Sequence, residues 1–300
     1  MKASYAHYTL HFRQPAGTSR GVLTDKETYF LKLEDEDMPG VFGLGECAVF
    51  RGLSADDVPT YEDKLRELCA NISADKETDL HEFPSIRFGL ETAINDFANG
   101  CRRQPFPSDF TEGMSAIPIN GLVWMGTKEE MLRRIDDKIK AGFTTIKLKV
   151  GAIDTESELD LVRHIRKVFP PEALTIRLDA NGGFTPDNAL QKLSDFARYG
   201  IHSIEQPIKQ GQWEAMRRIC SESPIDIALD EELIGIHTPE RMGEMLDAVR
   251  PKYIILKPSL IGGFSGSQDW IMQAARRDIG GWVTSALESN VGLNAIAQWT

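Results

Sequence analysis

The chain has 300 residues, of which 41% are hydrophobic and 26% are charged, a composition typical of a folded globular protein. Its 34 basic and 45 acidic residues give a formal net charge of −11, which disfavours nucleic acid and anionic membrane surfaces as general partners. Four scattered cysteines without a C-x-x-C pair predict reduced thiols and no zinc site. No run of residues reads as a membrane span or a cleavable leader, so we expect a cytoplasmic protein.

The first 115 residues show strand and helix patterns typical of an α+β unit. Apolar and polar residues alternate in the strand candidates, and apolar residues recur at helical spacing in the helix candidates. Proline and polar residues between positions 105 and 113 mark a linker, so we predict an α+β domain over residues 1–115. The strand candidates are residues 5–13, 28–33 and 43–48, and the helix candidates are residues 61–69 and 85–100.

From residue 116 onward, short apolar strand candidates alternate with amphipathic helical segments such as 128–142 and 156–169. Polar residues near the strand ends recur at intervals of 25 to 32 residues. This rhythm predicts an α/β fold with a parallel sheet, a (β/α) barrel of the modified TIM type. We expect the eighth strand beyond residue 300, so the predicted barrel domain, residues 116–300, is incomplete at its C-terminus. The seven strand candidates are residues 117–124, 144–150, 175–181, 203–208, 226–232, 253–258 and 282–286.

Three acidic residues stand near the carboxyl ends of three successive strand candidates: Asp179, Glu205 and Asp230. Barrel enzymes build their active sites at this end of the strands. Three carboxylates that converge there repel one another unless a cation lies among them, and hard divalent ions such as Mg²⁺ prefer oxygen ligands. We therefore predict a Mg²⁺ site; the alternative interpretation is a set of helix caps and surface acids.

Three lysines accompany these carboxylates. Lys147 and Lys149 lie two residues apart on one strand candidate and face the same side, and Lys257 interrupts the apolar run YIILKP. A cation beside one of the paired lysines would lower its pKa and make it a usable base. Lysines on two sides of a metal-bound substrate suit removal of a proton next to a carboxylate. The alternative for a single strand lysine is a side chain that extends from the rim to solvent.

Small residues near the ends of the last two strand candidates offer backbone N–H groups to an anion. Gly262 and Gly263 follow the sixth candidate, and Ser285 lies in the seventh. N–H groups near a helix start can hold a carboxylate or a phosphate. Loop flexibility explains the same residues nearly as well.

These motifs, in this order, resemble those of the enolase superfamily, in its muconate-lactonizing branch, and the likeness covers nearly the whole chain. The resemblance implies Mg²⁺ as cofactor, with Asp179, Glu205 and Asp230 as its ligands. It also implies Asn181 and Glu231 as residues that support the ligands, Glu231 being the alternative ligand. The motifs are KLK (147–149), RLDANGGF (177–184), IEQP (204–207), LDEE (229–232) and LKPSLIGG (256–263).

Within the branch, the sequence most resembles the o-succinylbenzoate synthase family. The implied reaction is the Mg²⁺-dependent syn dehydration of 2-succinyl-6-hydroxy-2,4-cyclohexadiene-1-carboxylate to o-succinylbenzoate in menaquinone biosynthesis. Lys149 would be the base, Lys257 would stabilise the enediolate, and Lys147 would bias Lys149 electrostatically. The segments that carry this likeness are GLGECAVFRGLS (43–54), INGLVWMG (119–126), KPSLIGGF (257–264) and SALESNVGLNAIAQW (284–299).

The same resemblance implies how the substrate is held. A capping domain would close over the barrel through a loop around residues 50–53, with Phe50 and Arg51 against the substrate. Gly262, Gly263 and Ser285 would help to hold the substrate carboxylates.

Other functions fit the same residues. An N-acylamino acid racemase or dipeptide epimerase on this scaffold needs both Lys149 and Lys257 as bases, whereas the dehydration needs one base. A muconate-type cycloisomerase shares the ligands and the lysines. A barrel that binds metal without catalysis is the alternative from a different class. For the enzymes, the partner is a small carboxylate substrate, and an oligomer is compatible with each function.

Overall fold

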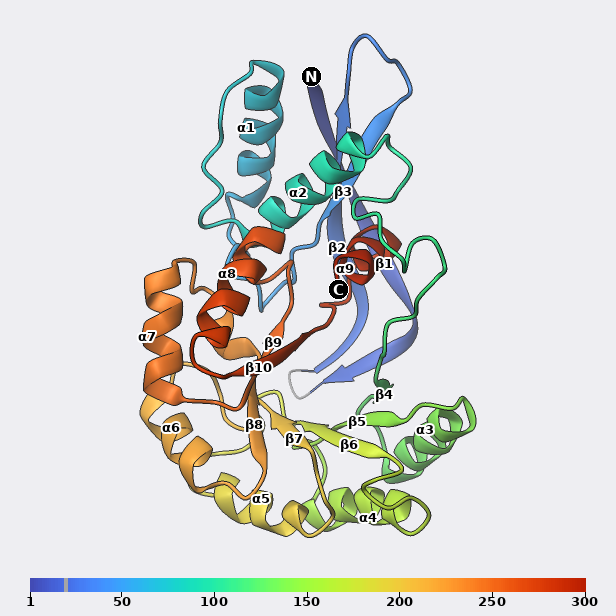
Figure 1. The fold of residues 1–300 in the computed structure, drawn as a ribbon, viewed down its shortest axis with the longest axis vertical. Coiled ribbons are helices and arrows are strands. Elements are labelled where there is room, and N and C mark those ends of the chain that lie inside the picture. Colours follow the sequence, from blue (N-terminus) through green and yellow to red (C-terminus); the bar gives the residue numbers. More distant parts are fainter. Residues whose placement is uncertain (19–20) are drawn as a thin grey trace.

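The computed structural model describes residues 1–18 and 21–300, and these residues form two sheets. An antiparallel sheet of three strands lies in the N-terminal part of the chain, and a parallel sheet of seven strands follows it. Figure 1 shows the first sheet with α1 and α2 at one end of the molecule, and α3 to α7 along the outside of the second sheet. None of the helices in the described part of the chain is long and apolar enough to cross a membrane.

The three strands and two helices expected in the N-terminal part are all present. The hairpin of β1 and β2 is longer than predicted, and its register shifts between His11 and Ala16. Pro15, which has no N–H to donate to a neighbouring strand, lies within that interruption. The elements are β1 (Lys2–Thr18), β2 (Gly21–Glu34), β3 (Phe42–Cys47), α1 (Tyr61–Ser73) and α2 (Pro84–Ala98).

The two helices cover one face of this sheet and form a separate apolar core. Leu65 and Leu68 of α1 and Ile86 of α2 pack with Leu31 and other buried residues of the strands. Helix α2 approaches β3 so closely that a Cβ at Gly45 would lie 1.8 Å from the Gly89 carbonyl oxygen. The division into domains at residue 115 stays a prediction.

The seven parallel strands follow one another in sequence order across the sheet, from β4 to β10. In the described part of the chain, β4 and β10 are the two edges and do not pair with each other. The curved sheet with its outer helices is therefore an open (β/α) barrel, as the sequence predicts. The strands are β4 (Gly121–Val123), β5 (Thr145–Lys149), β6 (Thr175–Asp179), β7 (Ser203–Glu205), β8 (Asp226–Leu229), β9 (Tyr253–Leu256) and β10 (Gly280–Val283).

The helices between these strands begin where the sequence provides capping groups. The Thr127 side chain accepts a hydrogen bond from the Glu130 N–H while the Glu130 side chain accepts from the Thr127 N–H, and Asp154 caps the next helix. The apolar faces of these helices and the strands form one large core. The helices are α3 (Lys128–Lys140), α4 (Thr155–Arg166), α5 (Ala189–Ala197), α6 (Trp213–Glu222), the 3₁₀ turn η1 (Glu231–Leu233), α7 (Pro239–Val249), α8 (Gly263–Ala275) and α9 (Asn290–Trp299).

The seventh parallel strand begins earlier than predicted. Gly280 and Gly281 pair with Tyr253 and Ile254 of β9, although glycine is a poor strand former and hides this start from pattern analysis. The strand ends at Val283, so Ser285 lies just beyond it.

Two carboxylates of the N-terminal part join it to helices of the barrel. Glu91 of α2 accepts a hydrogen bond from the Phe264 N–H at 2.6 Å, at the start of α8. Glu46 of β3 accepts from the N–H groups of Ser289 and Gly292, both at 2.9 Å, at the start of α9. Negative charge is favourable at a helix N-terminus, so these contacts fix α8 beside α2 and α9 beside β3 (Figure 1).

Candidate active site

The strand register brings the predicted ligands and lysines together. Lys149, Asp179 and Glu205 are direct neighbours across β5, β6 and β7 at the carboxyl ends of these strands. Asp230 follows the end of β8, and Lys257 follows the end of β9. The three carboxylate residues are each at most 2% exposed. The sequence-predicted cluster is thus gathered at one end of the barrel.

Each lysine of the cluster is paired with a carboxylate. Lys147 Nζ lies 2.8 Å from Asp179 Oδ2 and 2.6 Å from Glu205 Oε2. Lys149 Nζ lies 2.6 Å from Asp179 Oδ2, and Lys257 Nζ is paired with Asp230 Oδ2. Three cationic and three anionic groups therefore share one buried site, so they offset the cost that each charge would have alone.

The pKa values in the cluster follow from burial and from these pairs. Burial opposes charge on Lys147, but the Asp179 and Glu205 carboxylates outweigh it and raise the pKa of Lys147. The three lysines likewise overcome burial at Asp179 and hold its pKa below the ordinary range. Burial and the Asp179 charge raise the pKa of Glu205. The lowered lysine pKa expected from the sequence presupposes a cation, and the protein's own carboxylates act on Lys147 in the opposite direction.

The donor set fits a hard divalent cation. Three carboxylates extend from neighbouring strands, and the buried Glu205 Oε1 has no hydrogen-bond partner within the described residues. Oxygen atoms of this kind are the ligands that Mg²⁺ prefers. As the described side chains stand, no three acidic, histidine or cysteine groups already converge as a ligand set, because each carboxylate faces a lysine. Metal binding would therefore require the lysine and carboxylate side chains to turn.

Asn181 connects the two ends of the cluster. Its Oδ1 accepts a hydrogen bond from Lys149 Nζ at 2.6 Å, and its Nδ2 donates to Glu231 Oε1 at 3.0 Å. Its backbone N–H donates to Asp179 Oδ1 at 3.0 Å. Asn181 thus links Lys149 and Asp179 to Glu231, and the supporting role of Asn181 and Glu231 stays a prediction.

Gln206 is a residue of the site that the sequence analysis missed. Its Oε1 accepts from the Asp230 N–H at 3.1 Å and from the Glu232 N–H at 3.3 Å, and its Nε2 donates to Glu232 Oε2 at 3.0 Å. The side chain is fully buried. A buried amide directly after Glu205 in the motif IEQP was the available signal, because such a group needs hydrogen-bond partners. Gln206 fixes the end of β8 to the end of β7.

The two residues predicted in the capping loop have different surroundings. Phe50 is 9% exposed and packs with the apolar core of the barrel, so the loop reaches the second sheet. Arg51 is more exposed and pairs with Glu27 at 3.0 Å and with Asp57 at 2.8 Å, both in the N-terminal part. The structure thus brings Phe50 to the barrel, and Arg51 to neighbours within its own sheet and loop.

The predicted anion seat is built from left-handed backbone. Gly262 and Gly263 have φ values of 102° and 75°, which favour glycine. The Gly263 N–H donates to the Pro258 carbonyl at 2.8 Å, so this donor is already used. Ser285 lies half-buried after β10. Their contact with a substrate stays a prediction.

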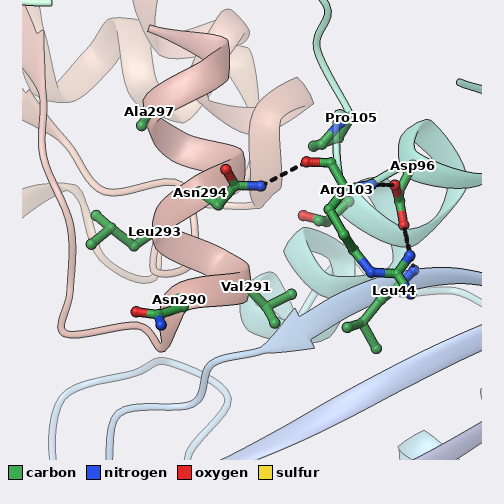
Figure 2. Close-up of a pocket in the computed structure, with 10 residues that line it drawn as sticks. Leu44, Asp96, Arg103, Pro105, Asn290, Val291, Leu293, Asn294 and Ala297 are labelled. Atoms are coloured by element: carbon green, nitrogen blue, oxygen red, sulfur yellow. Dashed lines mark hydrogen bonds and ion pairs between the residues drawn. The ribbon is translucent and has the colours of Figure 1, made fainter. Parts of the chain in front are cut away.

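A cavity of about 600 Å³ lies between α2, β3 and α9, outside the lysine and carboxylate cluster. Figure 2 shows its polar groups turned toward one another. The Arg103 N–H donates to Asp96 Oδ1 at 2.6 Å, and Asn294 Nδ2 donates to the Arg103 carbonyl at 2.9 Å. These groups satisfy each other's hydrogen-bonding capacity, and none of the residues predicted for catalysis or metal binding lines this cavity.

The chain matches known proteins over its whole length. A family model described as enolase C-terminal domain-like matches residues 130–300. The chain is 44% identical to the o-succinylbenzoate synthase of Desulfotalea psychrophila, across 100% of this chain and 90% of that protein. The crystal structure of MenC from the same organism has a TM-score of 0.88 and 42% identity, again with 100% and 90% coverage.

Two other relatives bear on the site. The crystal structure of the o-succinylbenzoate synthase from Thermosynechococcus elongatus, complexed with Mg in its active site, has a TM-score of 0.77 and 26% identity, with 99% and 88% coverage. The L-Ala-D/L-Glu epimerase of Bacillus subtilis is 29% identical over 87% of this chain and 74% of that protein. The resemblance read from the motifs is confirmed, and the chain belongs to the enolase superfamily, in its muconate-lactonizing branch.

Proposed function

We propose that this chain is an o-succinylbenzoate synthase, a hydro-lyase that dehydrates 2-succinyl-6-hydroxy-2,4-cyclohexadiene-1-carboxylate. The observation that carries the proposal is the buried cluster in which Lys149 and Lys257 approach the carboxylates from strands separated by three others. The 44% identity to a synthase over the full chain supports the same substrate. A cytoplasmic location and an oligomeric state stay predictions from the sequence.

Asp179, Glu205 and Asp230 are the proposed ligands of Mg²⁺, the cation bound in the active site of the Thermosynechococcus synthase. When bound, Mg²⁺ supplies positive charge against the carboxylate of the substrate as the neighbouring proton leaves. The three ligands come from the ends of consecutive strands, and Gln206 and Asn181 hold these ends in place.

Lys149 is the proposed base. As a neutral amine it abstracts the proton alpha to the ring carboxylate, and as an ammonium it then protonates the leaving hydroxyl on the same face. Asn181 orients its Nζ through the 2.6 Å hydrogen bond. Lys147, held between Asp179 and Glu205, adds positive charge to the site beside Lys149.

Lys257 acts from the opposite side of the site. Its ammonium is paired with Asp230 and is mostly buried, with 12% of the side chain exposed. A buried ammonium over a ring stabilises negative charge delocalised there through a cation–π contact. Lys257 therefore needs its charge and does not need to exchange a proton.

Epimerisation is the second candidate function, because lysines on both sides of a substrate can act as two bases. The identity of 29% to a dipeptide epimerase favours keeping this candidate. A Lys257→Arg variant separates the two reactions: substantial remaining turnover supports dehydration, since only the positive charge is needed. If the Lys257→Arg variant instead loses exchange of the alpha proton in one direction only, the result supports epimerisation.

The test is turnover of the cyclohexadiene substrate, followed as loss of its diene absorbance with and without Mg²⁺. We expect Mg²⁺-dependent turnover that falls by roughly 10³-fold in Lys149→Ala, because general acid–base catalysis is lost. Lys140→Ala, an exposed lysine at the end of α3, is the matched control and should retain activity. Bound Mg²⁺ without turnover would contradict the proposal and direct the assay to N-acylamino acids and dipeptides.

A further inference from the structure

Lys26 of β2 is a buried cation outside the cluster described above. The residue is 7% exposed, and its Nζ has no hydrogen-bond partner among the described residues. It shares a face of the strand with Thr28, whose hydroxyl donates to Glu46 at 2.8 Å on the side of the sheet that faces α9. A buried ammonium without a partner is costly, so its place in the fold calls for an explanation.

The nearby carboxylates do not supply that partner. Glu46 and Glu288 are the anionic groups within electrostatic reach of Lys26. Glu46 accepts hydrogen bonds from Thr28, from Gly292 and from both the N–H and the hydroxyl of Ser289. One Glu288 oxygen accepts from the Ser259 hydroxyl at 2.5 Å and the other from the Ala286 N–H at 2.7 Å. Both carboxylates therefore accept their hydrogen bonds from other donors, and neither forms one with the Lys26 ammonium among the described residues.

Glu288, which lies within electrostatic reach of Lys26, connects this cation to the carboxyl ends of the barrel strands. Ser259 lies two residues after Lys257, and Ala286 follows Ser285, so Glu288 spans the carboxyl ends of β9 and β10. A cavity of about 530 Å³ between the first sheet and the start of α9 is lined by Glu288 and by Leu10, the cross-strand partner of Lys26. The cavity thus borders the cross-strand neighbour of Lys26 and the carboxylate of Glu288, which lies within electrostatic reach of the cation.

We propose that Lys26 binds the second carboxylate of the substrate, the one on the succinyl chain remote from the reacting ring. The inference rests on the proposed function, which gives the substrate two carboxylates, one beside the reacting carbon and one at the end of a flexible chain. An ammonium that the protein leaves unpaired matches a carboxylate that the substrate brings. Lys26 is thus a specificity-determining residue of the N-terminal sheet, and it selects dicarboxylates.

The test compares two ligands that differ in this carboxylate alone. Binding of o-succinylbenzoate and of 2-butyrylbenzoate, in which a methyl group replaces the terminal carboxylate, is measured by calorimetry with the Mg²⁺-loaded protein. We expect Lys26→Met to weaken o-succinylbenzoate binding by roughly 10- to 100-fold, the size of a lost charge-assisted hydrogen bond. Binding of 2-butyrylbenzoate should change by less than about 2-fold, because its contacts do not include the ammonium.

Three further measurements make the result decisive. Lys26→Arg should retain the preference for the dicarboxylate, and Lys26→Gln repeats the loss of charge if Lys26→Met does not fold. Thr28→Val, on the same face of β2, controls for disturbance around Glu46 and should leave the ratio of the two affinities unchanged. If Lys26→Met weakens the binding of both ligands equally, or weakens neither, the inference is overturned. Wild-type turnover would still uphold the proposed function in that case. Absence of wild-type turnover would overturn both.

Discussion

Asp56 is a buried carboxylate in the segment between β3 and α1, close after Phe50 in the chain. It is 0% exposed, and its Oδ2 accepts hydrogen bonds from the Ser85 N–H at 2.8 Å and the Ser85 hydroxyl at 2.6 Å. These bonds fasten the segment to the start of α2. Burial nonetheless dominates and raises the pKa of Asp56 from 3.8 to about 6.

The raised pKa predicts how stability depends on pH. The folded protein holds this proton more tightly than the unfolded chain does, so stability falls as pH rises from 3.8 through about 6 and then levels off. The difference between the two pKa values corresponds to about 3 kcal/mol at neutral pH. Ionised Asp56 therefore destabilises the folded state, and the Ser85 hydrogen bonds offset part of that cost.

Asp56→Asn removes the titration and keeps an oxygen that can accept both Ser85 hydrogen bonds. Urea unfolding followed by tryptophan fluorescence should show the variant gaining about 3 kcal/mol relative to wild type between acidic and neutral pH. Asp187→Asn, at an exposed aspartate of the barrel, is the control and should show no such gain. A stability difference between Asp56→Asn and wild type that is the same at every pH would refute the reasoning.

Three more predictions concern the join between the N-terminal part and the barrel, and the site itself. Burial lowers the pKa of His237, whose ring lies 5.4 Å from that of His81. The unfolded chain therefore takes up this proton more readily, and the folded state loses stability as the pH falls below about 6.5. His237→Leu should reduce the loss of thermal stability on acidification. Gln206→Leu removes the acceptor for the Asp230 N–H and should weaken Mg²⁺ binding by roughly 10-fold or more in calorimetry; unchanged affinity would contradict its positioning role. Phe50→Ala should lower the free energy of unfolding by about 3 kcal/mol in urea titrations, because Phe50 packs in the barrel core.

The parallel strands were predictable because their residues are buried on both faces and read as short apolar runs between helical patterns. The same signal failed at Gly280 and Gly281, where pairing with β9 decides the strand and the side chains carry no pattern. The hairpin of β1 and β2 was predicted too short for a related reason. Most residues of its outer part are exposed and polar, so little alternation is left to detect.

The charged residues of the site were predictable because a charge at the end of a buried strand is rare without a partner. Which charges pair was not predictable, because Lys147 of β5 reaches carboxylates of both β6 and β7, and Lys257 after β9 pairs with Asp230 after the adjacent β8. Lys26 was missed because β2 shows nothing unusual as a sequence. The burial of Lys26 depends on a sheet face that the tertiary structure places against α9, more than 260 residues later in the chain.

The backbone beyond two of the proposed ligands shows how separate strands hold one cluster. Asn181 and Gln206 have φ values of 43° and 38°, in the left-handed region that costs about 1 kcal/mol for a residue other than glycine. Each turn sends a side chain back toward the neighbouring strands: Asn181 bonds Lys149 and Glu231, and Gln206 bonds the Asp230 N–H. Glycine would relieve the strain but would remove these hydrogen bonds. The strained turns thus hold the proposed base and the proposed ligands in a common arrangement that the strand register alone does not fix.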